Sequence, residues 1–240
     1  MTERSMTHVN LQFDEPAQHI SEILRRLDTV YTPPEWEPSG KPVDELVSTI
    51  LSQNTSDTNT ERAFSSLKSR FPAWKCVIDA DTASVESTIR SGGLARQKAP
   101  RIQQVLAGII DRDDMDPNSS LLNQLNDKSS AEAMEWLTGF GGVGPKTAAC
   151  VLLFAVGKPV VPVDTHVYRV SKRIGLIDDR TNANRAHGEL VDIVEPRDAF
   201  RFHMHLIQHG RQTCRARAPR CQECILNDIC RYGISILSNA

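Results

Sequence analysis

The chain has 240 residues, of which 40% are hydrophobic and 24% are charged, and its formal net charge is −2 at pH 7. This length allows one large domain or two small ones, and the composition is that of a globular protein. No segment approaches the roughly 20 consecutive apolar residues of a membrane span, and the polar first twenty residues do not match a secretory signal. We therefore expect an intracellular protein with no membrane partner.

The small net charge conceals an asymmetry along the chain. From Phe140 onward, 14 Lys and Arg residues stand against 9 Asp and Glu residues, whereas the remainder has 14 against 21. A basic C-terminal part is compatible with a polyanionic partner, because the potential at the contact face decides binding. A chance distribution of solvated side chains explains the same counts, so the asymmetry alone identifies no partner.

Apolar residues recur at helical spacing along the whole chain, and no segment alternates as a strand does. The spacing of Thr58 with Glu61, and of Ser129 with Glu132, is that of two capping boxes. Segment 31–42, with its four prolines and one glycine, predicts a linker, and 111–128 predicts a loop with at most a helical turn at 121–125. The sequence predicts an all-α fold with helices over 19–30, 43–53, 58–70, 84–90, 98–110, 129–137, 147–156, 165–174, 185–194 and 200–210.

The segment 139–144 has the pattern G-x-G-x-x-G, and Asp164 lies twenty residues beyond its last glycine. A dinucleotide-binding turn has this pattern, but it requires a buried strand before the glycines. The residues 129–137 that precede them are rich in Ala, Glu, Met and Leu and begin with a capping box, which indicates a helix. The context therefore favours a helix, a glycine turn and a second helix.

Such a hairpin is suited to binding a phosphate group. Gly142 and Gly144 can adopt positive φ and bring backbone N–H groups close to a phosphate. Pro145 suits the first position of the second helix, whose N-terminal end favours negative charge. A unit of this kind binds a DNA phosphate without reading the base sequence.

Four cysteines near the C-terminus form the pattern C-x6-C-x2-C-x5-C. Four cysteines this close together in an intracellular chain indicate metal ligands before disulfides. The wide gaps suit a zinc site poorly, whereas four thiolates from one short segment fit a [4Fe–4S] cluster, with zinc or a disulfide pair as the alternatives. The predicted ligands are Cys214, Cys221, Cys224 and Cys230.

Arginines accumulate around the first of these cysteines. Four of them and no acidic residue lie between Gly210 and Cys221. A loop fixed at both ends by a cluster would present them to DNA phosphates, although solubility or compensation of the cluster's charge explains them as well. The predicted DNA contacts are Arg211, Arg215, Arg217 and Arg220.

Residues 142–148 followed by 163–170 resemble the motifs of the helix-hairpin-helix DNA glycosylases of the endonuclease III family. The cysteine spacing is similar to the cluster-binding segment of that family, and the resemblance extends from about residue 43 to 232. It implies that Lys146 and Asp164 are catalytic. The departures are small: Gly141 stands where the family often has proline, and Pro145 where it often has a basic residue.

The implied chemistry explains why these two residue types occur together. A neutral lysine amine attacks the sugar carbon that carries the base and then holds the sugar as a Schiff base, from which β-elimination nicks the strand. Asp164 would orient or deprotonate the lysine, or stabilise positive charge on the sugar. Outside these motifs, Lys146 would be interpreted as a solvated helix-terminal lysine and Asp164 as a helix N-cap.

A glycosylase must also flip the target base out of the duplex and fill the gap. The resemblance assigns this task to two loops, one at 51–57 and one at 93–98. Asn54 stands at the family's gap-filling glutamine, with Gln53 adjacent, so either is a candidate. Leu94 is the expected wedge, with a packing role at the helix start as the alternative. His166 is expected to line the base pocket, with a core or capping role as the alternative.

The resemblance also implies a two-domain organisation. We expect a six-helix barrel domain with the hairpin over 43–156, and an iron–sulfur cluster domain formed by 1–42 and 157–240, with the active site in the cleft between them. The expected function is a monomeric DNA glycosylase with abasic-site lyase activity, acting on duplex DNA that contains damaged pyrimidines or abasic sites. The alternatives are action on mispaired thymine or pyrimidine dimers, and a cluster-bearing DNA-binding or redox-sensing protein without catalysis.

Overall fold

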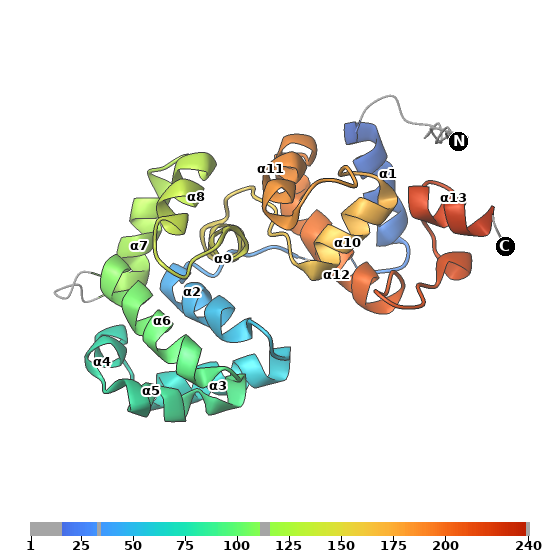
Figure 1. The fold of residues 1–240 in the computed structure, drawn as a ribbon. Coiled ribbons are helices and arrows are strands. Elements are labelled where there is room, and N and C mark those ends of the chain that lie inside the picture. Colours follow the sequence, from blue (N-terminus) through green and yellow to red (C-terminus); the bar gives the residue numbers. More distant parts are fainter. Residues whose placement is uncertain (1–15, 33–34, 111–115, 239–240) are drawn as a thin grey trace, which may run out of the picture. The chain divides into compact units, whose positions relative to one another are not determined.

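The computed structural model describes residues 16–32, 35–110 and 116–238, and within these ranges it contains helices and irregular segments but no strand. The all-α prediction is therefore confirmed for the described residues. No described helix combines the length and the apolar character needed to cross a membrane. The chain divides into two compact units, one of residues 37–162 and one of residues 1–36 with 163–240 (Figure 1).

The unit of residues 37–162 is built around helix α2 (Pro42–Ser52). Val43, Leu46, Val47, Ile50 and Leu51 form its predicted apolar face and are fully buried. The other helices of this unit are α3 (Asp57–Arg70), α4 (Trp74–Asp79), α5 (Thr82–Thr88), η1 (Arg90–Gly92), α6 (Ala95–Ile109), α7 (Pro117–Asn126), α8 (Ser130–Thr138), α9 (Pro145–Cys150) and the π-helical turn η2 (Val151–Val156). Helix α2 packs against α3, α6, α7, α9 and the π-helical turn η2.

Two local predictions in this unit are wrong. The cap of α3 is Ser56, whose side chain accepts the N–H of Asn59, so the capping box predicted at Thr58 does not form. The segment expected to be a loop contains α7, which begins at Pro117 after the capping residue Asp116. Asn118 fixes this helix by accepting the backbone N–H of Val43, a partner 75 residues away that no local pattern reveals.

The expected linker belongs in part to this unit. The N–H groups of Ser39 and Gly40 donate to the carbonyls of Phe154 and Ala155, at the end of η2. Gly157 has a φ of +84°, and a Cβ there would lie 2.9 Å from Pro38, so only glycine permits this contact. These contacts explain why the compact unit extends from 37 to 162, beyond the expected limits of 43 and 156.

The second unit is organised around α12 (Ala199–Gln212), which packs against α1 (Pro16–Asp28) and α10 (Thr165–Ile174). The predicted apolar stripe of α1 is buried, with exposed fractions of 0–2% for Ile20, Ile23, Leu24 and Leu27. Trp36 stacks on Phe200 with ring centroids 5.6 Å apart. The remaining helices are α11 (Ala183–Ile193), η3 (Pro196–Asp198), η4 (Cys221–Glu223) and α13 (Arg231–Leu237).

Candidate DNA-repair site and metal centre

The glycine turn joins α8 to α9, as predicted for a hairpin. Ser129 and Glu132 form the predicted capping box of α8. Gly142 has a φ of +95°, and a Cβ there would lie 2.7 Å from Cγ of Arg101, so the backbone and the close contact both require glycine. Gly144 does not use positive φ, because it is the N-cap of α9 with extended backbone (φ −88°). Pro145 occupies the first position of α9.

Lys146 is the second residue of α9 and is half-buried. Helix α9 packs against α2, which carries the half-buried Glu45. Burial raises the pKa of Glu45, while a hydrogen bond from Thr49 and the charge of Lys146 act in the opposite direction. The Thr49 hydroxyl donates to Glu45 Oε1 at 3.0 Å. Lys146 therefore has a carboxylate of its own unit in its electrostatic environment, which the sequence did not reveal.

Asp164 is the N-cap of α10. Its Oδ1 accepts the backbone N–H groups of His166 at 2.8 Å and Val167 at 2.7 Å. The capping role is therefore observed, and the catalytic role stays a prediction. Both capping bonds go to one oxygen of the carboxylate, so the role of N-cap does not use its Oδ2.

His166 follows directly in α10 and is half-buried. Arg169 donates to its Nδ1 at 3.0 Å and also to the carbonyl of Gly210 at 2.9 Å. A Cβ at Gly210 would lie 2.9 Å from Cβ of His166, so α12 approaches α10 closely at this glycine. Because Nδ1 of His166 accepts a hydrogen bond from Arg169, a neutral His166 ring carries its proton on Nε2. A role for His166 in a base pocket stays a prediction.

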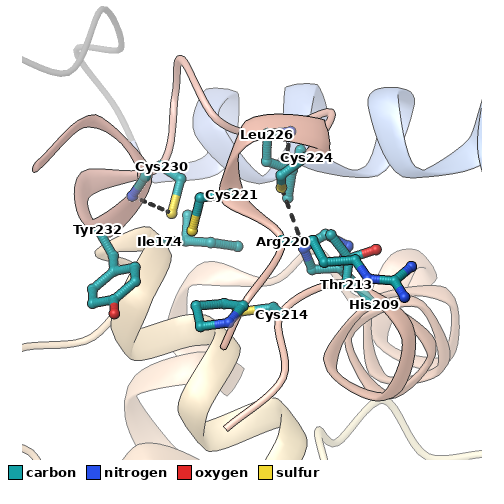
Figure 2. A pocket seen from close by; sticks show the side chains of 12 residues that line it. Ile174, His209, Thr213, Cys214, Arg220, Cys221, Cys224, Leu226, Cys230 and Tyr232 are labelled. Carbon is teal, nitrogen blue, oxygen red and sulfur yellow. Dashed lines mark hydrogen bonds between the residues drawn. The ribbon is translucent and has the colours of Figure 1, made fainter. Parts of the chain in front are cut away.

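The four predicted ligand cysteines line one pocket of the second unit, together with His209 and Tyr232 (Figure 2). Backbone N–H groups of Leu226 and Gly233 donate to the sulfurs of Cys224 and Cys230, each at 3.4 Å. His209 Nε2 lies 3.6 Å from the sulfur of Cys224. The four thiols therefore surround one pocket, although they lie up to sixteen positions apart in the sequence.

This donor set fits an iron–sulfur cluster. Burial raises the pKa of Cys224 to about 11 and also raises the pKa of Cys221 and Cys230, so their thiolates are stable only with a compensating cation. Within the described ranges, no three His, Cys, Asp or Glu side chains are grouped as a site for a single metal ion. Four cysteine thiols around one pocket are the donor set that a [4Fe–4S] cluster requires.

Two arginines of α10 hold the first cysteine and the loop that follows it. Arg169 donates to the carbonyl of Cys214 at 3.0 Å. Arg173 donates to the carbonyls of Arg215 at 2.6 Å and Ala216 at 3.1 Å. Neither arginine was predicted from the sequence, because these partners are backbone carbonyls more than forty residues away. The four arginines predicted to contact DNA, Arg211, Arg215, Arg217 and Arg220, are all exposed.

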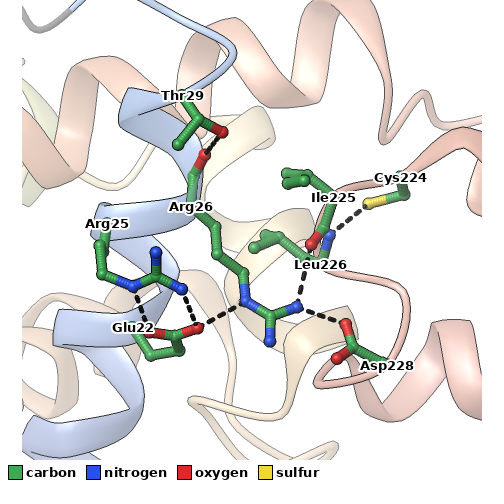
Figure 3. A network of polar contacts seen from close by, with 8 residues as sticks. All are labelled: Glu22, Arg25, Arg26, Thr29, Cys224, Ile225, Leu226 and Asp228. Carbon is green, nitrogen blue, oxygen red and sulfur yellow. Dashed lines mark hydrogen bonds and ion pairs between the residues drawn. The ribbon is translucent and has the colours of Figure 1, made fainter.

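A second set of arginine contacts attaches α1 to the segment between the last two cysteines (Figure 3). Arg26 donates to Glu22 at 2.7 Å, to the carbonyl of Ile225 at 3.1 Å and to Asp228. Arg25 donates to both oxygens of Glu22, each at 2.7 Å. The backbone around the cluster ligands is therefore fixed from two helices.

The residues expected to open the duplex lie in the unit of residues 37–162. Leu94 is 46% exposed and Asn54 is exposed, whereas Gln53 is half-buried and its Oε1 accepts from Arg101 at 3.1 Å. This difference favours Asn54 over Gln53 as the side chain available to DNA. Leu94 is the N-cap of α6 and its side chain is exposed, and its role as a wedge stays a prediction.

Comparisons with known proteins agree on one class. Residues 47–196 match the family described as HhH-GPD superfamily base excision DNA repair protein, and 214–230 match the iron-sulfur binding domain of endonuclease III. A Synechocystis endonuclease III is 35% identical over 190 residues, covering 79% of this chain and 80% of the relative. An Arabidopsis thaliana protein whose name assigns it to the DNA glycosylases is 37% identical over 169 residues, and the chain spans 56% of its length.

A solved structure is also similar over nearly the whole chain. It is a trapped covalent intermediate of endonuclease III with DNA, which superposes with a TM-score of 0.71 at 27% identity. The superposition covers 92% of this chain and 98% of that one. A non-covalent complex of endonuclease III with DNA has a TM-score of 0.72. The match to the iron-sulfur domain spans all four cysteines of the pocket.

Proposed function

Because the chain belongs to the endonuclease III family of base excision repair DNA glycosylases and carries the [4Fe–4S] binding domain of that family, we propose that it is a bifunctional glycosylase and abasic-site lyase. Its substrates in this proposal are damaged pyrimidines and abasic sites in duplex DNA, and it acts as a monomer. The supporting observation is Lys146, half-buried at the start of the hairpin's second helix, in a chain similar to one trapped covalently on DNA.

The reaction begins with the amine of Lys146. Its nitrogen attacks C1′ of the deoxyribose, the glycosidic bond breaks, and the base leaves with the bonding electron pair and takes up a proton. The sugar ring then opens as its oxygen accepts a proton, which leaves an iminium between Lys146 and C1′. Removal of a proton from C2′ expels the 3′ phosphate, so the strand is nicked and the two activities share one intermediate.

Asp164 supplies negative charge to the same chemistry. Its Oδ1 is held by two N–H groups of α10, which fixes the carboxylate without using Oδ2. A fixed carboxylate stabilises the positive charge that develops on the sugar as the base departs. Because one oxygen is already committed to capping, replacing Asp164 by asparagine keeps the cap while removing the charge.

DNA binding in this proposal combines the hairpin with the arginine loop. The N–H groups around Gly142 and Gly144 contact one phosphate, and the exposed arginines of 211–220 contact others. Cys214, Cys221, Cys224 and Cys230 hold the cluster, which fixes both ends of that loop when it is bound. Leu94 and Asn54 enter the duplex as the base is flipped, and His166 lines the pocket that receives the base.

Borohydride trapping tests the central assignment. Borohydride reduces an iminium to a stable amine, so we expect wild-type protein to become covalently attached to DNA that contains a lesion or an abasic site. Lys146→Gln should reduce trapping and strand cleavage by roughly 100-fold or more while leaving DNA binding intact. Lys75→Gln, which changes an exposed lysine of the same unit, is the matched control.

The same experiment separates the alternatives. Trapping by Lys146→Gln equal to that of wild type would show that another amine is the nucleophile. DNA binding without trapping or excision by wild type, on any duplex, would indicate the non-catalytic class. A panel of duplexes that each carry one oxidised pyrimidine, mispaired thymine or pyrimidine dimer identifies the preferred lesion.

A further inference from the structure

Lys98 of α6 is a lysine in the core. Its side chain is 2% exposed and belongs to the largest fully buried side chains of the protein. The ammonium donates to the carbonyl of Leu51 at 2.6 Å and to the carbonyl of Gly92 at 2.7 Å. Burial lowers the pKa of Lys98, because taking a charge out of water is costly unless hydrogen bonds replace the hydration. A buried cation with two short bonds to backbone carbonyls has a definite structural task.

Both carbonyls lie at ends of helices. Leu51 is the penultimate residue of α2, and Gly92 is the last residue of η1. Carbonyls in the last turn of a helix have no partner within the helix and carry partial negative charge. Gly92 allows η1 to lie close to α3, since a Cβ at this position would lie 3.1 Å from Cβ of Ala63. The ammonium of Lys98 therefore joins two helix ends that are 41 residues apart in sequence.

The chain continues from these two ends directly into the segments that the proposed function assigns to opening DNA. Asn54 follows α2, and Leu94 follows η1 after Gly93. Asn54 has a φ of +55° and Leu94 a φ of +50°, and the one other described non-glycine residue with positive φ is Ala218. Left-handed backbone is unfavourable for leucine and persists only where neighbouring structure holds it.

Helix α6 holds both segments by further bonds. The backbone N–H of Lys98 donates to the carbonyl of Leu94 at 3.0 Å, and its ammonium donates to that of Gly92. Lys98 therefore contacts the turn of residues 92–94, here called the wedge turn, through both its backbone and its side chain. One turn later, Arg101 donates to Gln53 at 3.1 Å, and its aliphatic stem lies against Gly142 of the hairpin. The same face of α6 thus contacts the segments that carry Asn54 and Leu94, and also the glycine turn at Gly142.

We propose that Lys98 is a positioning residue for base flipping, whose ammonium fixes the distance between the Asn54 and Leu94 segments so that both enter the duplex together. This inference rests on the proposed function of those segments. The binding of two separate side chains to one opened base pair requires them to be correctly placed before contact, because ordering them afterwards costs binding energy. With a side chain that is 2% exposed, Lys98 acts through these segments rather than on DNA directly.

Lys98→Met removes the ammonium while keeping an unbranched apolar stem, and Lys75→Met is the control with the same change of charge. Single-turnover excision is compared on a duplex lesion and on the same lesion placed in an unpaired bulge. We expect Lys98→Met to lose about 10- to 100-fold on the duplex and less than about threefold on the bulge. The fluorescence rise of 2-aminopurine beside the lesion should fall with the duplex rate.

Hydrogen exchange provides a readout that does not depend on catalysis. The N–H of Gln97 donates to the carbonyl of Leu94, so its exchange rate reports on the wedge turn. We expect Lys98→Met to accelerate this exchange at least about tenfold relative to core amides of α2. Equal losses of excision on duplex and bulge, or unchanged exchange at Gln97, would overturn the proposal.

The two proposals fail separately. If wild type excises no lesion and cannot be trapped, the proposed function is wrong, and the exchange rate still decides whether Lys98 positions the turns. If Lys98→Met does not fold, Lys98→Arg keeps the charge and the donors in a larger side chain. A duplex-selective loss in Lys98→Arg supports the positioning role, and equal loss on both substrates contradicts it.

Discussion

Two groups of ionisable side chains, one in each unit, lie in contrasting environments. In the unit of residues 37–162, burial lowers the pKa of Lys98 and raises the pKa of Glu45. In the unit that carries the cysteines, hydrogen bonds from Arg25 and Arg26 lower the pKa of Glu22 to about 2, and Arg26 lowers that of Asp228. Burying a charged group such as Lys98 or Glu45 costs stability. The arginine–carboxylate pairs of Glu22 and Asp228 lie nearer the surface, where each pair contributes a small stabilisation.

The largest effect that would test this contrast is expected from Arg26→Met. The substitution removes bonds to Glu22, Asp228 and the carbonyl of Ile225, and so releases the segment between the last two ligand cysteines. We expect the free energy of unfolding of this unit to fall by about 1–2 kcal/mol. Loss of iron under a chelator, followed by absorbance near about 400 nm, should become faster than in wild type.

Arg25→Met is the control for this prediction. Arg25 is 67% exposed and contacts Glu22 on the same helix, so it does not reach the cysteine segment. Its replacement should leave the rate of iron loss unchanged. Equal acceleration in the two variants would mean that helix charge, rather than the attachment of 225–228 to α1, protects the cluster.

Glu22→Gln should have a smaller effect that depends on pH. The pKa of Glu22 is lowered from 4.5 to about 2, so its contribution to stability is fully present above pH 4.5 and is lost as the pH falls through about 2. We expect a loss of about 0.5 kcal/mol at neutral pH, as for ion pairs at the surface. Unfolding free energies measured at pH 7, 4 and 2.5 should show the two proteins converging. A difference that stays constant over this range would contradict the pairing.

Features that depend on residues close together in the sequence were predicted, whereas features that depend on distant residues were not. The apolar stripes of α1 and α2 and the cysteine spacing are local patterns, and the structure confirms the helices and the common pocket. Helix α7 escaped prediction because it buries only Leu121 and Leu125 and depends on the bond from Val43 to Asn118. Propensity and spacing carry no information about such a partner.

The site shows the same division. Lys146 and Asp164 stood out through the motifs around them, whereas Lys98, Arg169 and Arg173 act on distant carbonyls and leave no spacing pattern. One signal for Lys98 was available. It lies on the same helical face as Ile102, Val105 and Ile109, and a lysine on an apolar stripe either extends to solvent or is buried with partners.

The smallest expected effect, and the one of opposite sign, comes from Glu45→Gln. Burial raises the pKa of Glu45 above 4.5, so the folded state favours the protonated form. The stability linked to that proton is fully present below pH 4.5 and is lost as the pH rises through the folded pKa. At neutral pH the variant, which keeps an acceptor for Thr49, should be as stable as wild type or more stable by less than about 0.5 kcal/mol.

Thermal unfolding of wild type and Glu45→Gln at pH 4 and at pH 7 checks this sign. The variant should gain relative to wild type as the pH rises, whereas Glu22→Gln should lose relative to wild type over the same interval. A Glu45→Gln protein that is less stable at pH 7 than at pH 4, compared with wild type, would show that the carboxylate is paired rather than merely desolvated. Glu45 would then resemble Glu22 and Asp228 of the other unit, and burial would no longer distinguish it from these paired acids.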